Sequence, residues 1–353
     1  MDELRRDRSV VRLAPDVRAD ADDADLVDRI SGAVPMTRRT HEVLSWAEEV
    51  GRQVPLPGAG ATATRWEVLA SVAARDLVAA RSLEPHLDAL AILAEAGSLS
   101  EASLGDGTWG VWAAEGPGVR LRASRRAGHW VLDGVKPWCS LAGEVSGGLV
   151  TAWVDDEHRG MFAVDARHPG FSADDAEWGP AGLAEVATAT VTMRDVPARP
   201  VGDPGWYLTR PGFAWGGIGV AAVWFGGAVA VARRLGREAL RREPDDIALL
   251  HLGEVDAHLA AARTMLAHAA QEVDGGRTTG GTSALLAARV RHVVAGAAEE
   301  VLVRTAHGLG PGPLSCEPDH AQRVADLSLY LRQHHAERDA VALGRMLLRA
   351  PSP

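Results

Sequence analysis

The chain has 353 residues, 46% of them hydrophobic and 24% charged, which is typical of a globular protein and excludes an extended disordered one. The formal net charge of −10 would repel a phosphate backbone, so we expect no nucleic-acid partner. The sequence has only two cysteines, and they lack metal-ligand spacing. We therefore expect a cytoplasmic protein with neither a disulfide framework nor a metal site.

The first third of the chain predicts helices. Residues 1–28 alternate basic and acidic side chains, without the apolar stretch of a secretory signal, and we expect them to lead into a first helix. Over residues 65–97 the apolar side chains recur at helical spacing: Leu69, Val72, Ala73, Leu77 and Ala80. Pro85 is expected to open a second helix that ends at Gly97. These patterns predict an N-terminal helical domain over residues 1–105.

The period of the pattern then changes from helical to alternating. Apolar Val119, Leu121 and Ala123 are separated by polar residues, and a turn follows at Ala127 and Gly128. Further short segments bounded by Gly, Pro or Asp read as strands: 149–153, 161–164 and 186–193. Residues 106–205 are therefore expected to form a compact antiparallel β domain.

Helical periodicity returns after Trp206. Four long helices are expected: 213–243, 246–273, 283–307 and 320–349. Their short connections predict a C-terminal four-helix bundle over residues 206–353. Residues 212–232 carry no charge and are long enough to span a bilayer. Because this stretch contains six glycines and continues into a charged helix, we expect a buried helix and no association with a membrane.

This order of domains, together with several local phrases, resembles the acyl-CoA dehydrogenase superfamily from about Ser45 to the C-terminus. The phrase GHWVLDGVKPWCS, residues 128–140, is similar to the family's β-domain signature, and residues 191–197 resemble its last strand. The resemblance implies the acyl-CoA dehydrogenase fold. This is an α+β multidomain fold with an N-terminal helical domain, a middle antiparallel β barrel and a C-terminal four-helix bundle, and FAD lies between the last two.

The end of the β-domain signature is similar to the family's flavin contacts. Trp138 matches the ring-stacking aromatic, Ser140 matches the hydroxyl at flavin N5, and Cys139 lies between them. Alternate residues of a strand share a face, which agrees with a common role for Trp138 and Ser140. The other interpretation of Trp138 is an ordinary core aromatic, the commoner fate of a tryptophan in a strand.

Three further segments resemble flavin contacts of the family. Trp112, Ala113 and Ala114 match a loop whose backbone holds the pyrimidine end of the flavin, with Ala114 in place of the usual Thr. Arg242, Gly308 and Gly310 match positions that reach the cofactor of a neighbouring subunit, and His307 takes the place of the usual Gln there. The resemblance therefore implies an oligomer. Taken alone, the glycine-rich run from Gly308 would be a helix end and a turn.

The candidate catalytic residue is His334. Alignment of Ala325, Asp326 and Tyr330 with the family places His334 where acyl-CoA dehydrogenases carry the Glu that removes the α-proton. Imidazole, with an unperturbed pKa of ~6.5, can serve as a base near neutral pH. The alternative is that residues 331–339 are a solvated helix face. A family Arg near the base is also missing, because its position falls on Gly217.

Three functions are compatible with these residues. The first is an FAD-dependent oxidoreductase that dehydrogenates an acyl thioester such as acyl-CoA, or a related small molecule. The second is a non-catalytic or half-site subunit that assembles with a paralogous subunit, as the loss of the family's Glu and Arg suggests. The third is a flavin-dependent monooxygenase on the same fold, with His334 near the flavin and reduced flavin supplied by a partner reductase.

Overall fold

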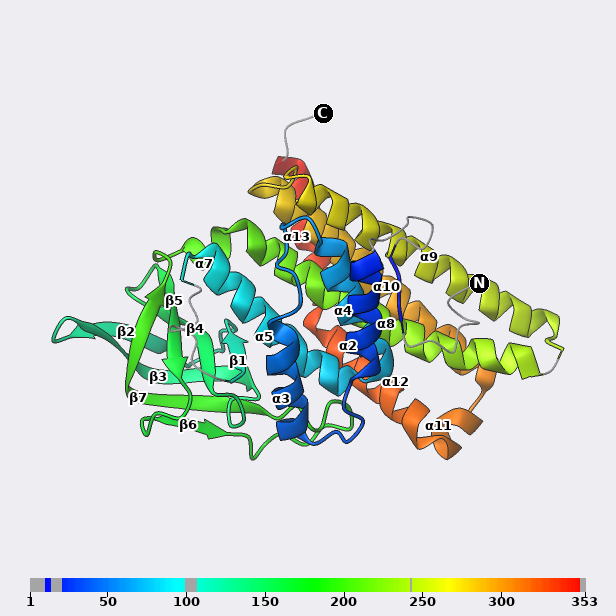
Figure 1. The fold of residues 1–353 in the computed structure, drawn as a ribbon, viewed down its shortest axis with the longest axis horizontal. Coiled ribbons are helices and arrows are strands. Elements are labelled where there is room, and N and C mark those ends of the chain that lie inside the picture. The colour runs from blue at the N-terminus through cyan, green and yellow to red at the C-terminus, as the bar shows by residue number, and fades with distance from the viewer. Residues whose placement is uncertain (1–9, 14–20, 99–106, 242, 350–353) are drawn as a thin grey trace.

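The computed structural model describes residues 10–13, 21–98, 107–241 and 243–349. A barrel lies at one end of the molecule, a bundle of long helices extends away from it, and the N-terminal helices pack against the start of that bundle (Figure 1). The chain order is therefore helices, barrel and bundle, as the sequence predicts.

The described N-terminal region is helical. Its helices are α2 (Ala21–Gly32), α3 (Thr40–Gly51), α4 (Thr62–Arg75) and α5 (Leu77–Glu95). The prediction that Pro85 opens a helix is wrong, because Pro85 lies inside α5. The start of α5 is set by Asp76, whose backbone is extended and whose carboxylate accepts a hydrogen bond from the Ala79 amide (2.8 Å).

The middle region is a closed barrel. Its strands are β1 (Trp109–Trp112), β2 (Leu121–Arg126), β3 (His129–Ser140), β4 (Gly147–Trp153), β5 (Arg159–Asp165), β6 (Phe171–Asp174) and β7 (Thr188–Val201). The ring runs β4-β2-β3-β7-β5 and closes because β5 also pairs with β4. Most ladders are antiparallel, whereas β1 pairs with β4 in parallel. The expected barrel is confirmed.

The C-terminal region is helical from α7 (Trp206–Thr209) onward. It continues with α8 (Pro211–Arg241), α9 (Asp246–Asp274), α10 (Gly281–Leu309), α11 (Gly312–Cys316), α12 (Pro318–Tyr330), the 3-10 turn η1 (Leu331–Gln333) and α13 (Glu337–Arg349). The prediction of one helix over 320–349 is wrong. The backbone is extended at His334 and left-handed at Ala336 (φ 45°). These two residues end the helix, and α13 begins after them in a new direction.

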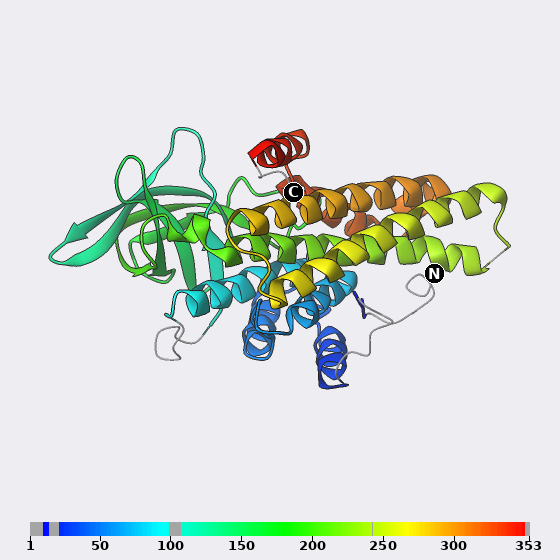
Figure 2. The same ribbon diagram turned by 90° about the horizontal axis from the view of Figure 1, so that it is seen from above.

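Helix α8 is the central helix of the fold and lies between the N-terminal helices and α10 (Figure 2). It is long and apolar enough to cross a membrane, but most of its apolar stretch is buried inside the protein. Glycine allows this close packing, because a Cβ at Gly226 would lie 2.0 Å from the carbonyl oxygen of Ala70 on α4. The uncharged stretch is therefore a core helix, as expected from its glycines.

A buried carboxylate joins the three regions. Asp326 on α12 is fully buried and accepts hydrogen bonds from the Arg38 guanidinium (2.9 Å), the Leu183 amide (2.7 Å) and the Gln322 side chain (2.7 Å). Arg38 also pairs with Asp76 at the start of α5 (3.0 Å). This network fixes the N-terminal helices and the barrel against the turn that follows α12.

Candidate functional site

A β-bulge turns Trp138 out of the barrel. The register between β3 and β7 shifts between Lys136 and Cys139, and Trp138 has a left-handed backbone (φ 59°), which is strained for a large side chain. As a result its side chain is 65% exposed. Trp138 is therefore not a core aromatic, and its indole is available to pack against a ligand.

Cys139 points the opposite way. Its side chain is fully buried, and this burial raises the pKa of the thiol to about 12. The thiol is inert inside the barrel, so any contact of Cys139 with a cofactor at the Trp138 surface comes from its backbone.

The Ser140 hydroxyl lies where β3 meets helix α5. Arg81 on α5 donates a hydrogen bond to Ser140 Oγ (3.1 Å), and Thr188 Oγ1 on β7 lies 3.0 Å from the same oxygen. Arg81 also lies over the ring of Tyr330, with its Cζ 5.6 Å from the ring centroid. The hydroxyl thus joins the barrel to both helical regions.

The loop after β1 lies beside Trp138. The Trp112 side chain is buried and its Nε1 donates to the carbonyl oxygen of Ser140 (3.1 Å). Further along, a Cβ at Gly116 would lie 2.8 Å from Cγ of Pro137, the residue before Trp138. The two segments that the sequence analysis assigned to flavin are therefore adjacent.

An ion pair between a buried lysine and a partly exposed carboxylate secures this loop. Lys136, only 1% exposed, donates to Glu115 (2.5 Å) and to Thr151 Oγ1 (2.8 Å). Ala114, beside Glu115, is an exposed residue, and Ala113 is half-buried. An exposed indole, a hydroxyl and an exposed loop suit a planar apolar ring with a polar edge, so these residues fit a flavin.

The pocket that contains His334 has a volume of about 500 Å³ and lies among α5, α8, α10 and the turn before α13. Its polar lining is Glu84, Asp88, Tyr207, Arg210, Arg291, Gln333, His334, His335 and Asp339. Apolar groups from α8, α10 and α13 form the rest of the wall. A pocket of this size accommodates a small molecule.

His334 faces into the protein. Its side chain is 9% exposed, and its Nε2, buried and without a hydrogen-bond partner among the described residues, lies 3.8 Å from Asp339 Oδ2. Burial lowers the pKa of His334 below its usual value, and the positive charge of Arg291 lowers it further, while Asp339 opposes the shift. The neighbouring His335 is 63% exposed. His334 is thus not part of a solvated helix face.

Arg291 on α10 is a pocket residue that the sequence analysis missed. Its guanidinium donates to the carbonyl oxygens of Gly217 (3.0 Å) and Gln333 (3.2 Å) and lies over the Trp224 ring at 4.7 Å. A Cβ at Gly217 would lie 3.5 Å from Arg291 Cδ. A guanidinium from another helix therefore lies beside position 217, where the resemblance leads one to expect an Arg. Its only sequence signal is a charge between the apolar residues Val290 and Val294.

The pocket carboxylates were also missed. Burial raises the pKa of Glu84 to about 7, although Arg81 lies 3.5 Å away and opposes the shift. Burial likewise raises the pKa of Asp88, which lies 3.7 Å from Arg210. Both carboxylates belong to α5 and face the pocket only because α5 packs against α8.

The remaining expected flavin contacts lie elsewhere. Gly308, at the end of α10, packs against Leu235 and His251, and His307 lies 5.8 Å from His251 between ring centroids. Leu235 is 18 residues from Gly217 along α8, roughly 27 Å at 1.5 Å per residue. His307, Gly308 and Gly310 therefore lie far from the pocket at Gly217 within one chain, and Arg242 lies outside the described residues.

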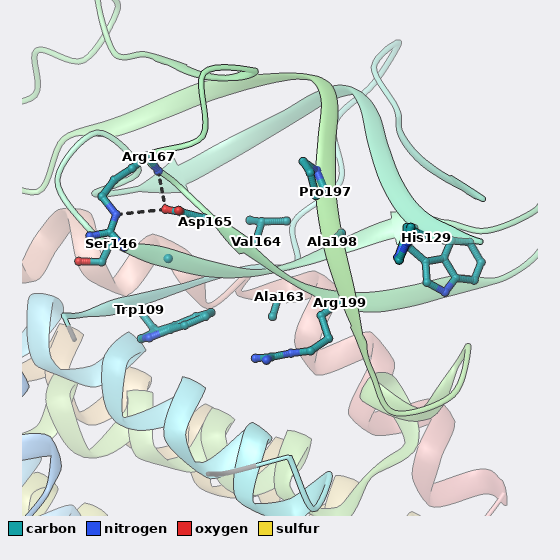
Figure 3. A pocket seen from close by; sticks show the side chains of 12 residues that line it. Trp109, His129, Ser146, Ala163, Val164, Asp165, Arg167, Pro197, Ala198 and Arg199 are labelled. Carbon is teal, nitrogen blue, oxygen red and sulfur yellow. Dashed lines mark hydrogen bonds and ion pairs between the residues drawn. The ribbon is translucent and has the colours of Figure 1, made fainter. Parts of the chain in front are cut away.

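A second cavity, of about 420 Å³, lies at the barrel and contains none of the residues assigned to flavin or substrate. Figure 3 shows Arg167 bonded to Asp165 at one side, and Trp109 and Arg199 at another. This cavity shares no lining residue with the pocket at His334.

No protein-family model and no curated protein matches this chain in sequence. Solved structures do match. Butyryl-CoA dehydrogenase from Megasphaera elsdenii is 17% identical, with 94% of this chain and 100% of that chain covered and a TM-score of 0.77. Glutaryl-CoA dehydrogenase from Mycobacterium smegmatis, in complex with FADH2, is 15% identical, with coverages of 95% and 96% and a TM-score of 0.78.

A monooxygenase has a similar structure. TdsC from Paenibacillus sp. A11-2, a dibenzothiophene monooxygenase solved in complex with FMN and indole, is 15% identical, with coverages of 95% and 98% and a TM-score of 0.78. At these identities the likeness establishes the fold. The chain has the acyl-CoA dehydrogenase fold, which flavin oxidoreductases of more than one reaction type share.

Proposed function

We propose that this chain is an FAD-dependent oxidoreductase of the acyl-CoA dehydrogenase type whose substrate occupies the pocket at His334. The observation that carries the proposal is the position of His334, which lines a pocket large enough for a small substrate and whose buried Nε2 has no hydrogen-bond partner among the described residues. A buried polar atom without a partner is costly, and a bound substrate would satisfy it.

The assigned roles follow from the geometry. Trp138 and Ser140 would hold the flavin ring, and the backbone of Ala113 and Ala114 would hold its edge. When bound, a flavin supplies a two-electron acceptor. His334 accepts the proton that the substrate loses, because burial lowers the pKa of its imidazole and so favours the neutral form, which has a ring nitrogen free to take up a proton.

The pocket also restricts the acyl group. Glu84, Asp88, Arg210 and Arg291 line it, and a long aliphatic chain would deprive these polar groups of water without replacing their hydrogen bonds. The substrate we propose is therefore an acyl thioester with a short or polar acyl group, or a related polar molecule. The built pocket favours a catalytic chain over a degenerate subunit.

Anaerobic reduction tests this function. The flavin-loaded protein is mixed without oxygen with butyryl-CoA or glutaryl-CoA, and loss of the flavin absorbance is followed. Reduction by either compound that His334→Gln abolishes supports the proposal. If neither compound reduces the flavin, while substrate-dependent oxygen uptake occurs with chemically reduced flavin, the chain is a monooxygenase instead. A chain that binds flavin and does neither is a half-site subunit.

A further inference from the structure

Arg291 differs from the other cations around the pocket. Arg210 pairs with Glu95 at 2.6 Å and with Asp88 at 3.7 Å, and Arg81 pairs with Glu84 at 3.5 Å. In contrast, no carboxylate of the described residues forms an ion pair with Arg291. Its charge is therefore not neutralised by a direct ion pair.

The hydrogen bonds of Arg291 lead to the same conclusion. A guanidinium carries five N–H groups, and Arg291 uses two of them, both with neutral backbone carbonyl oxygens, those of Gly217 and Gln333. Three N–H groups are left for a ligand. Burial lowers the pKa of Arg291, while Asp339 and Glu84 oppose the shift from beyond ion-pair distance.

The Arg291 guanidinium lies close to His334. Arg291 lies over one indole, that of Trp224, and the His334 ring lies 6.3 Å from the same indole, edge-on. Both side chains line the pocket, and Gly217 leaves the space that Arg291 fills. A ligand in this pocket thus lies beside both Arg291 and His334.

We propose that Arg291 binds an anionic group of the substrate, such as a carboxylate or a phosphate, inside the pocket at His334. A guanidinium and a carboxylate form two parallel hydrogen bonds, which offsets the cost of holding an unpaired cation away from water. This inference rests on the proposed function for the location of the substrate, and it adds the chemical class: a small molecule with an anionic group beside its reacting centre.

The test is calorimetric titration of the full chain with benzoate, with its neutral analogue benzamide, and with inorganic phosphate. Arg291→Gln removes the charge, and Arg289→Gln removes an exposed arginine two positions away on the same helix. We expect benzoate, phosphate or both to bind the wild type and Arg289→Gln, and the Arg291→Gln affinity to fall about tenfold or more. Benzamide should not distinguish the variants.

Other outcomes overturn the proposal. It fails if neither anion binds the wild type, if Arg291→Gln binds them as tightly as the wild type, or if benzamide binds as well as benzoate. If Arg291→Gln does not fold, Arg291→Lys replaces it and should retain part of the affinity, because the charge stays while the fork is lost. Weaker binding to phosphate than to benzoate identifies a carboxylate as the natural group, and the reverse identifies a phosphate.

A double variant distinguishes two roles of Arg291: binding an anion through its charge, and supporting the turn at Gln333 through a hydrogen bond. The double variant Gly217→Arg with Arg291→Ala places a guanidinium on α8 in the space that Arg291 vacates, without the bond to Gln333. We expect it to regain part of the benzoate affinity of Arg291→Ala. No recovery in a folded protein contradicts a role for the charge itself. Because no flavin is added, a failure here is distinguishable from a failure to bind flavin.

Discussion

Arg81 on α5 donates a hydrogen bond to the Ser140 hydroxyl at the end of β3 (3.1 Å). This contact brings the N-terminal helices to the hydroxyl that is expected to meet the flavin. It also connects two parts of the site, because Arg81 pairs with Glu84 in the pocket and lies over Tyr330. The expected flavin contact at Ser140 and the pocket at His334 are therefore linked through one side chain.

This link predicts energetic coupling. Ser140→Ala removes the acceptor, and Arg81→Gln removes the donor and leaves Glu84 without its partner. In a double-mutant cycle, the free energies of unfolding should be non-additive by about 0.5 to 3 kcal/mol, the range for residues in one hydrogen-bond network. Urea denaturation of the four proteins measures this. Additivity within about 0.3 kcal/mol would show that the contact is energetically unimportant.

His334 predicts an unusual pH dependence. Because burial lowers its pKa, the neutral basic form persists as the pH falls through ~6.5, the value for a free imidazole, and activity should be lost only below that pH. His334→Gln should abolish turnover and keep the flavin. His41→Gln is the matched control, since that side chain is 74% exposed and does not line the pocket. If activity is already lost above pH 6.5 as the pH falls, or if His334→Gln is fully active, a residue other than His334 is the base.

Asp326 predicts a large effect on stability. Asp326→Ala removes the carboxylate that holds Arg38, the Leu183 amide and Gln322, and it leaves a guanidinium partly buried and short of one partner. The loss in free energy of unfolding should be about 3 to 5 kcal/mol, as for other broken buried ion pairs. Asp165→Ala breaks an exposed pair with Arg167 and should cost within about 0.5 kcal/mol. Equal effects of the two changes would refute the bridging role of Asp326.

The far end of the bundle predicts assembly. Leu240, Ile247 and Leu250 are 62%, 63% and 50% exposed at the junction of α8 and α9. Several exposed apolar side chains at one place in the fold are typical of an interface. Ile247→Asp should therefore lower the mass measured by light scattering towards that of one chain, whereas Val341→Asp, on α13, should not. A wild-type mass of one chain would rule out this interface.

The fold was largely predictable because it depends on local periodicity. The expected helix over 246–273 is α9 (Asp246–Asp274), and the expected turn at Ala127 and Gly128 joins β2 to β3. The errors fall at Pro85 and at residues 331–336. In both places one capping or left-handed residue decides the outcome, and periodicity does not report such residues.

The site was predictable only in part. Trp138, Ser140 and His334 belong to continuous phrases that a resemblance can match. Arg291 and Glu84 come from helices far apart in the chain, and only packing brings them to the pocket. A helical pattern shows that a charge lies on a helix, but it does not show which neighbouring helix that charge faces.

Flavin binding tests the central claim most directly. The purified full chain is titrated with FAD and with FMN, both oxidised and chemically reduced, and absorbance and protein-bound flavin are measured for the wild type and for Trp138→Ala. We predict saturable binding by the wild type. Loss of the exposed indole should weaken it by about 1 kcal/mol or more, roughly fivefold, without loss of fold. Absence of binding in every form of the flavin, or equal binding by a folded Trp138→Ala protein, would contradict the account.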